Sequence, residues 1–206
     1  MKQDSPAAKR LDLLPEVFTF NDLTNDTYLG DAAMTSEAAK KFLIRARDRG
    51  LVARAAEDNG RASVYYNLRR DIDGPINRPM EAAHLLYEEA LVIGLSVLHT
   101  YGWITQIPKI VDIAIHSTRR SCPKIRGVNF YFRPLEWFRN QKKSGAILDH
   151  RESEFVLPSL TPRAALDDIN LYRDMWVPAK DDLFMPANEE EGVRREVPKR
   201  SAERNR

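Results

Sequence analysis

The sequence predicts an α+β fold, and three observations lead to that class. Apolar residues recur at helical spacing in the first 50 positions. An Asn-Gly pair at 59–60 separates two short β-prone runs, which is typical of a tight hairpin. The runs VDIAI (111–115) and VNFYF (128–132) are typical of buried strands set between helical segments. We therefore expect one domain over residues 1–72, a mixed α/β domain over 79–185 and a disordered charged tail over 186–206.

Composition limits the classes of protein that fit. The chain has 206 residues, and 43% of them are hydrophobic, which is enough for a sizeable core. The longest apolar run, 90–98, is far shorter than the roughly 20 residues of a membrane-spanning helix, so no membrane partner is expected. The first ten residues lack the apolar stretch of a secretory signal, and a cytoplasmic location follows as the expectation. One cysteine and four scattered histidines predict neither a metal site nor a cofactor.

Charge is unevenly distributed along the chain, although the net charge is only +2. Residues 35–70 hold nine Lys and Arg against four Asp and Glu, and residues 108–143 hold nine against two. Residues 144–192 are acidic, with four against eleven, and residues 193–206 are basic, with six against two. Such segregation favours a polyanionic partner over a uniformly solvated surface.

The elements of the first domain follow from local signals. Apolar spacing predicts a helix over 6–14 that ends before Pro15, an extended piece at 17–20 and a second helix through Asp22 and Leu23. A loop is expected around Gly30. A third helix, capped by Thr35 or Ser36, runs to Gly50, and two strands at 51–55 and 62–68 complete the unit. Helices followed by a β-ribbon in this order are typical of a winged helix-turn-helix.

In a winged helix-turn-helix the third helix enters the major groove of double-stranded DNA, and the hairpin contacts phosphate or the minor groove. Hydroxyl side chains at the start of the third helix can read bases, and basic side chains along it can neutralise phosphates. Two alternatives stay open, a winged helix used only for protein contact and a helix whose charges are merely solvated. The predicted DNA-binding residues are Thr35, Ser36, Lys40, Lys41, Arg45, Arg47, Arg54, Asn59 and Arg61.

The second domain mixes helices and strands. We expect a helix from Pro79, a short helix from Ser96 to Tyr101, strands at 110–115 and 128–132, a helical turn at 135–139 and a helix opened by Thr161 and Pro162. A second basic surface is predicted here, and DNA, RNA and protein all remain open as its partner. Its residues are Lys109, Arg119, Arg120, Lys124, Arg126 and Arg133.

Several short motifs together resemble the AbiEi-type antitoxins of bacterial toxin-antitoxin systems. They are FTFNDL (18–23), RARDRGLV (45–52), SVLHTYGW (96–103), TQIP (105–108) and LTPRAALDD (160–168), with Trp176 and DDL (181–183). The resemblance covers about residues 15–185. It implies an N-terminal winged helix, an antitoxin-type second domain and repression of the protein's own operon at operator repeats. It also implies that a cognate nucleotidyltransferase-like toxin is counteracted without stable contact.

Two other functions stay open. The chain could regulate other genes, with a second domain that senses a ligand or partner. It could also be a nucleotidyltransferase-related enzyme, because Gly94 and Ser96 followed by Asp112 resemble the Gly-Ser and Asp-x-Asp pair of such enzymes. Here the second carboxylate position holds Ala114, and one carboxylate cannot form a two-metal site. We therefore predict no catalytic residues and no enzymatic activity.

Overall fold

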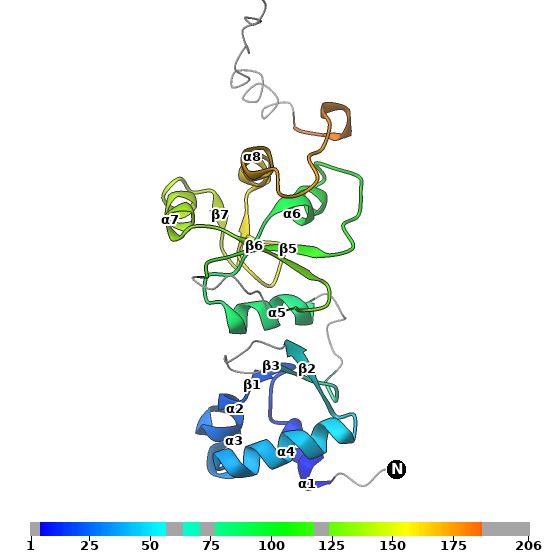
Figure 1. Ribbon diagram of the computed structural model, residues 1–206, viewed down its shortest axis with the longest axis vertical. Helices are drawn as coiled ribbons and strands as arrows, with labels where there is room; N and C mark the ends of the chain where they lie inside the picture. Colours follow the sequence, from blue (N-terminus) through cyan, green and yellow to red (C-terminus); the bar gives the residue numbers. More distant parts are fainter. Residues whose placement is uncertain (1–4, 57–63, 71–76, 118–123, 187–206) are drawn as a thin grey trace, which may run out of the picture.

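The computed structural model describes residues 5–56, 64–70, 77–117 and 124–186. Within these ranges the chain is a mixed α+β structure with eight α-helices and two β-sheets (Figure 1). The expected Asn59–Gly60 turn and the expected disordered tail, apart from Pro186, lie outside these ranges. No helix among the described residues has both the length and the apolar character needed to cross a bilayer.

The first elements largely follow the expected order, with one addition. The expected first helix ends early, at Leu11, and a short helix stands where a loop was expected before Gly30. That helix has only four residues, too few for apolar spacing to reveal it. The elements are α1 (Pro6–Leu11), β1 (Val17–Thr19), α2 (Asn21–Thr24), α3 (Asp26–Leu29), the 3-10 turn η1 (Gly30–Ala32), α4 (Ser36–Asp48), β2 (Val52–Ala56) and β3 (Val64–Asn67).

The first sheet is antiparallel, with strand order β1-β3-β2. Successive side chains of a strand point to opposite faces, and β1 shows the consequence. Phe18 is fully buried among the helices, in a cluster with Leu11, Leu23 and Leu43. Its neighbour Val17 belongs to a different cluster, which lies on the other face of the sheet. The sheet is therefore covered on both faces.

Helix α5 (Asn77–Leu86) covers that other face (Figure 1). Met80 and Ala83 of α5 are buried in one cluster with Val17 and Val64 of the first sheet. The same cluster continues into the second half of the chain, where Tyr87 packs against Phe130 with ring centroids 5.6 Å apart. The apolar core thus runs without a break across the predicted domain boundary at 72–79.

The second sheet is mixed, with strand order β6-β5-β4-β8-β7. The expected strands β5 (Val111–Ile115) and β6 (Val128–Phe132) are confirmed and run parallel. Three two-residue strands were not expected, because pairing with distant segments defines them rather than local pattern. They are β4 (Leu91–Val92), β7 (Ile147–Leu148) and β8 (Ser159–Leu160), and the remaining elements are α6 (Gly94–Thr100), α7 (Leu135–Lys143), α8 (Pro162–Tyr172) and η2 (Lys180–Asp182).

Candidate nucleic-acid interface

Helix α4 is the longest helix of the described residues, and its sequence defines both of its ends. The Thr35 hydroxyl accepts a hydrogen bond from the Ala38 N–H at 3.3 Å, as an N-cap does. Gly50 follows the helix with φ of 67°, a left-handed conformation that favours glycine and stops the helix. Ala39, Leu43 and Ala46 form the buried stripe, in agreement with their helical spacing.

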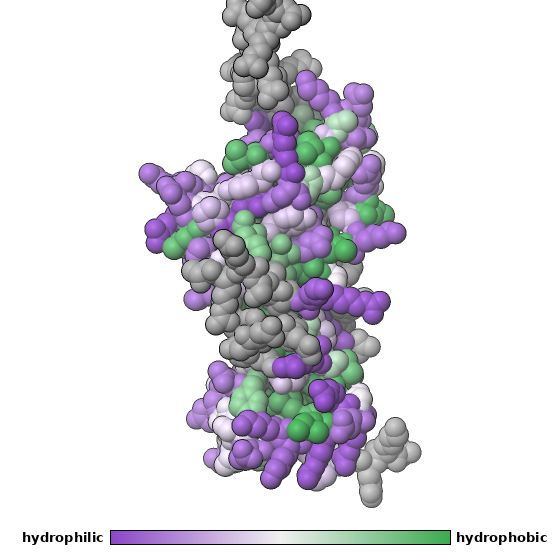
Figure 2. All heavy atoms as spheres, viewed as in Figure 1, coloured by the Kyte–Doolittle hydropathy of each residue, from purple (hydrophilic) through white to green (hydrophobic). Residues whose placement is uncertain are grey.

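The opposite side of α4 is exposed along its whole length, and basic side chains dominate it. We call this surface the α4 face; it consists of Ser36, Glu37, Lys40, Lys41, Ile44, Arg45, Arg47 and Asp48. Figure 2 shows hydrophilic side chains gathered over α4 at the end of the molecule that carries the N-terminal elements. Lys40 lies 3.8 Å from Glu37, with both side chains well exposed, and such a pair contributes little to stability. The α4 face therefore carries a net positive charge that is open to solvent.

The other residues predicted to contact DNA divide into two groups. Thr35 is exposed at the N-terminus of α4, and Arg54 is exposed on β2, opposite Tyr65 of β3. Asn59 and Arg61 lie outside the described residues. The structure thus brings Thr35 and the α4 face together at one end of the molecule, with Arg54 on the adjoining sheet.

A groove runs along one side of α4, where α1 lies beside it. Its volume is about 560 Å³. Four basic side chains line it: Arg10 from α1, Lys41 and Arg45 from α4, and Arg49 from the end of α4. We call it the α1–α4 groove. Arg10 and Arg49 were not predicted as site residues. Arg49 follows Lys41 and Arg45 at helical spacing, so this spacing could have revealed it, whereas only the pairing of α1 with α4 in space brings in Arg10.

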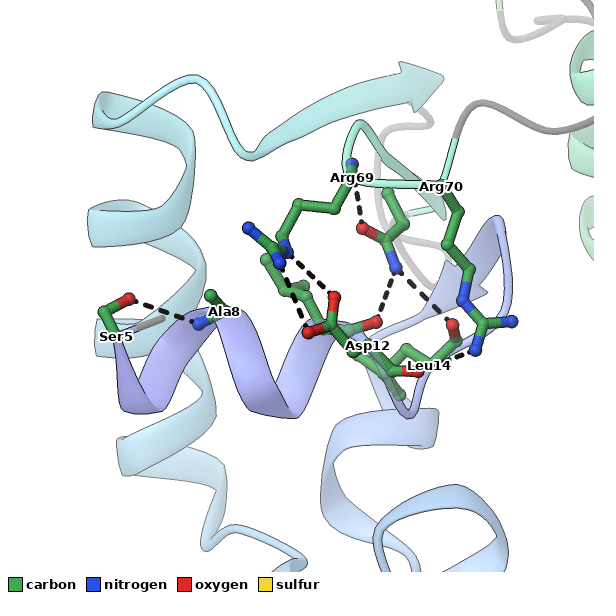
Figure 3. Close-up of polar contacts among 8 residues, drawn as sticks. Ser5, Ala8, Asp12, Leu14, Arg69 and Arg70 are labelled. Atoms are coloured by element: carbon green, nitrogen blue, oxygen red, sulfur yellow. Dashed lines mark hydrogen bonds and ion pairs between the residues drawn. The ribbon is translucent and has the colours of Figure 1, made fainter. Parts of the chain in front are cut away.

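Polar contacts fix α1 beside β3 and so set one wall of the α1–α4 groove (Figure 3). The buried Asn67 amide donates to the Leu11 carbonyl at 2.7 Å. Arg69 pairs with Asp12 at 2.8 Å, and Arg70 donates to the Asp12 carbonyl at 2.6 Å. The hydrogen bond from Arg69 lowers the pKa of Asp12 below its usual value. These bonds anchor the C-terminal end of α1 to the sheet.

The second basic surface is only partly supported. Lys109, Lys124 and Arg126 are exposed, and the pairing of Val111 with Val128 places Lys109 and Arg126 at the same end of the second sheet. Arg119 and Arg120 lie outside the described residues.

Arg133 does not belong to that surface, which corrects the prediction. Its side chain is 1% exposed and pairs with Asp168 at 2.8 Å and with Asp174 at 2.7 Å. The guanidinium also lies 3.8 Å from the centroid of the Tyr172 ring. Burial opposes the charged form of Arg133, but its hydrogen bonds to the two carboxylates outweigh burial and raise its pKa. Arg133 therefore joins β6 to α8 from within.

Gly94 and Asp112, which resemble residues of nucleotidyltransferases, lie next to each other, but side chains cover the Gly94 backbone. Gly94 begins α6 with φ of 69°, and Asp112 of β5 lies directly beside it. A Cβ on Gly94 would stand 3.1 Å from the Asp112 carboxylate and 2.7 Å from the Met175 sulfur, so both groups cover the backbone there. Burial raises the pKa of Asp112 to about 6. Among the described residues, no group of three metal-ligating side chains comes together.

No protein-family model matches this chain, and no curated protein matches its sequence significantly.

Proposed function

We propose that residues 6–67 form a winged helix-turn-helix that binds double-stranded DNA through the α4 face. The observation that carries the proposal is the α4 face itself, because its four exposed Lys and Arg side chains on a capped helix can neutralise phosphates. The order of elements and the strand order β1-β3-β2 support the same assignment. Thr35 and Ser36 at the N-terminus of α4 are the candidates for base contacts, and Lys40, Lys41, Arg45 and Arg47 for phosphate contacts.

A mobility shift with the DNA upstream of the protein's own gene tests this proposal. We expect a shift at low salt. We also expect the Lys41→Ala and Arg45→Ala double variant to raise Kd by about a hundredfold or more, since hydrogen bonds involving charged groups contribute about 1.5–3 kcal/mol each. The Arg151→Ala and Lys180→Ala double variant removes two exposed charges from the other half of the chain and should bind as the wild type does. Absence of a shift at low salt would contradict the proposal.

We further propose, from the resemblance to AbiEi-type antitoxins, that the protein represses its own toxin-antitoxin operon and counteracts a nucleotidyltransferase-like toxin. Co-expression with such a toxin gene tests the second half of this proposal. Growth should be restored by the wild type without a stable complex on co-purification. A toxin that remains fully active in the presence of the protein would rule out the antitoxin role, while DNA binding could still hold.

A second candidate function is regulation of other genes by a ligand-sensing second domain. A groove of about 590 Å³ between the end of α5 and α7 favours it. Leu91 and Phe138 form an apolar floor, and Glu88 faces a lining that also contains Arg139 and Lys142. Mapping of chromosomal binding sites separates the two functions. Autorepression predicts one dominant site at the protein's own promoter, whereas wider regulation predicts sites at many promoters.

A further inference from the structure

The α1–α4 groove carries more positive charge than a solvated helix surface normally does. Lys41, Arg45 and Arg49 follow one another at spacings of four residues, so they stand in a row along α4, and Arg10 faces the row from α1. Like charges at this spacing destabilise a helix. Helix surfaces that are merely solvated usually carry charges of alternating sign.

Among the described residues that line the groove, none is a carboxylate that could offset this row. In the described part of the chain, none of the four cations has an ion-pair partner, in contrast to Lys40, which lies beside Glu37. Successive cations of the row are four residues apart, about 6 Å of helix rise, which is within the 8–10 Å over which salt screens charges at ordinary ionic strength. An anion that entered the groove would relieve their mutual repulsion.

The rest of the groove suits a phosphate backbone. Its lining also includes the short side chains of Ala38 and Ala46, beside the larger Met34 and Phe42. Ser5 and Thr35 stand in the lining, and each hydroxyl oxygen accepts a hydrogen bond from its own helix. Each O–H therefore remains a donor, and phosphate oxygens are acceptors.

We infer that the α1–α4 groove holds phosphates of one DNA strand, so that Arg10 and Arg49 contact the DNA backbone and align α4 in the major groove. This inference rests on the proposed function. It adds two contact residues and gives α1 a part in binding. Because these contacts go to phosphate, they strengthen binding to every DNA sequence to a similar degree.

The salt dependence of DNA binding by the full chain tests the inference. Each phosphate contact contributes about 0.9 to the slope of log K against log salt concentration. The Arg10→Ala and Arg49→Ala double variant should therefore reduce the slope by about 1.8 on both promoter and unrelated DNA. Arg49→Lys keeps the charge and should retain its share of the slope. The matched Arg151→Ala and Lys180→Ala variant should keep the full slope. Circular dichroism of each variant verifies folding.

The outcomes are distinguishable. If the wild type binds no DNA, both the proposed function and this inference fail. If the wild type binds and the Arg10→Ala and Arg49→Ala variant retains the full slope, the inference alone fails. A calorimetric titration with inorganic triphosphate tests whether the groove binds a small phosphate ligand instead of DNA. Triphosphate binding that is lost in this variant, while the DNA slope is unchanged, would assign the groove to a small phosphate ligand and overturn the DNA assignment.

Discussion

At the scale of single residues, Asp112 stands out: among the described residues, no cationic side chain pairs with this buried carboxyl. It is 5% exposed, and the Asn129 amide donates to it at 3.4 Å. Burial raises its pKa from 3.8 to about 6, and the hydrogen bonds offset this only in part. Together with Met175 it covers the backbone of Gly94.

The raised pKa of Asp112 predicts a pH-dependent stability difference. A carboxyl whose folded-state pKa is raised does not lower the free energy of unfolding while it is protonated in both the folded and the unfolded state. As pH rises from 3.8 to about 6, the unfolded state loses this proton before the folded state does, so the free energy of unfolding falls. Above pH 6 the carboxyl is ionised in both states and the loss is complete. Relative to the wild type, Asp112→Asn should therefore gain up to about 3 kcal/mol of unfolding free energy between pH 4 and pH 7.5. Urea titrations at a series of pH values measure this, and a difference that stays constant with pH would count against it.

At the scale of elements, α4 combines a stability role and a proposed binding role, and Thr35 contributes to both. Loss of an N-cap hydroxyl costs about 1 kcal/mol. Thr35→Ala should lower the free energy of unfolding by that amount, whereas Thr35→Ser should keep the cap and the stability. Denaturant unfolding at constant pH provides the comparison. Equal stability of Thr35→Ala and the wild type would show that the hydroxyl does not cap α4.

Helix α8 is held to the end of β6 by the buried ion pair between Asp168 and Arg133. Removing Arg133 leaves the carboxylate of Asp168 buried without its partner, which costs about 3–5 kcal/mol for pairs of this kind. Arg133→Met should be destabilised by about that amount, and adding Asp168→Leu should recover a large part of the loss. The two variants are compared by denaturant unfolding. No recovery in the double variant would mean that Arg133 stabilises mainly through its contact with Tyr172.

Local signals predicted the elements that carry their own start and stop residues. Thr35 caps the start of α4 and Gly50 follows its end, and Thr161 with Pro162 starts α8. These signals stand next to the helix ends that they define, so the sequence alone reveals them. The two-residue strands could not be predicted, because they exist only through pairing with distant partners. Arg133 shows the same limit for the site. Its partners Asp168 and Asp174 lie 35 and 41 residues away in the sequence. The residues next to Arg133 in the sequence therefore indicated an exposed basic surface, whereas the fold buries its side chain.

At the scale of the whole molecule, one apolar cluster spans the two halves of the chain. The α4 face lies at one end, and α8, within the acidic stretch 144–192, lies toward the other (Figure 1). DNA that approached the α4 face would meet its positive charge and lie at a distance from α8. The shared core means that the N-terminal unit is incomplete without α5, since Val17 and Val64 are 4% and 0% exposed only because α5 covers them.

Two fragments test this dependence on α5. Residues 1–76 leave the face of the sheet that carries Val17 and Val64 uncovered, whereas residues 1–90 add α5 and the segment that follows it. Burying a valine side chain contributes about 1.5–3 kcal/mol. The shorter fragment should therefore unfold at a clearly lower temperature and expose apolar surface to a hydrophobic dye. Equal melting temperatures would show that the N-terminal unit is stable without α5.

The central claim is that the α4 face is the surface that binds DNA. The most direct measurement follows backbone amide resonances of the isotope-labelled full chain while promoter DNA is added. Resonances of α4, Ser36–Asp48, should shift first and most, together with Arg10, while those of α8 stay in place. Shifts confined to the second half of the chain, or no shifts at low salt, would contradict the claim.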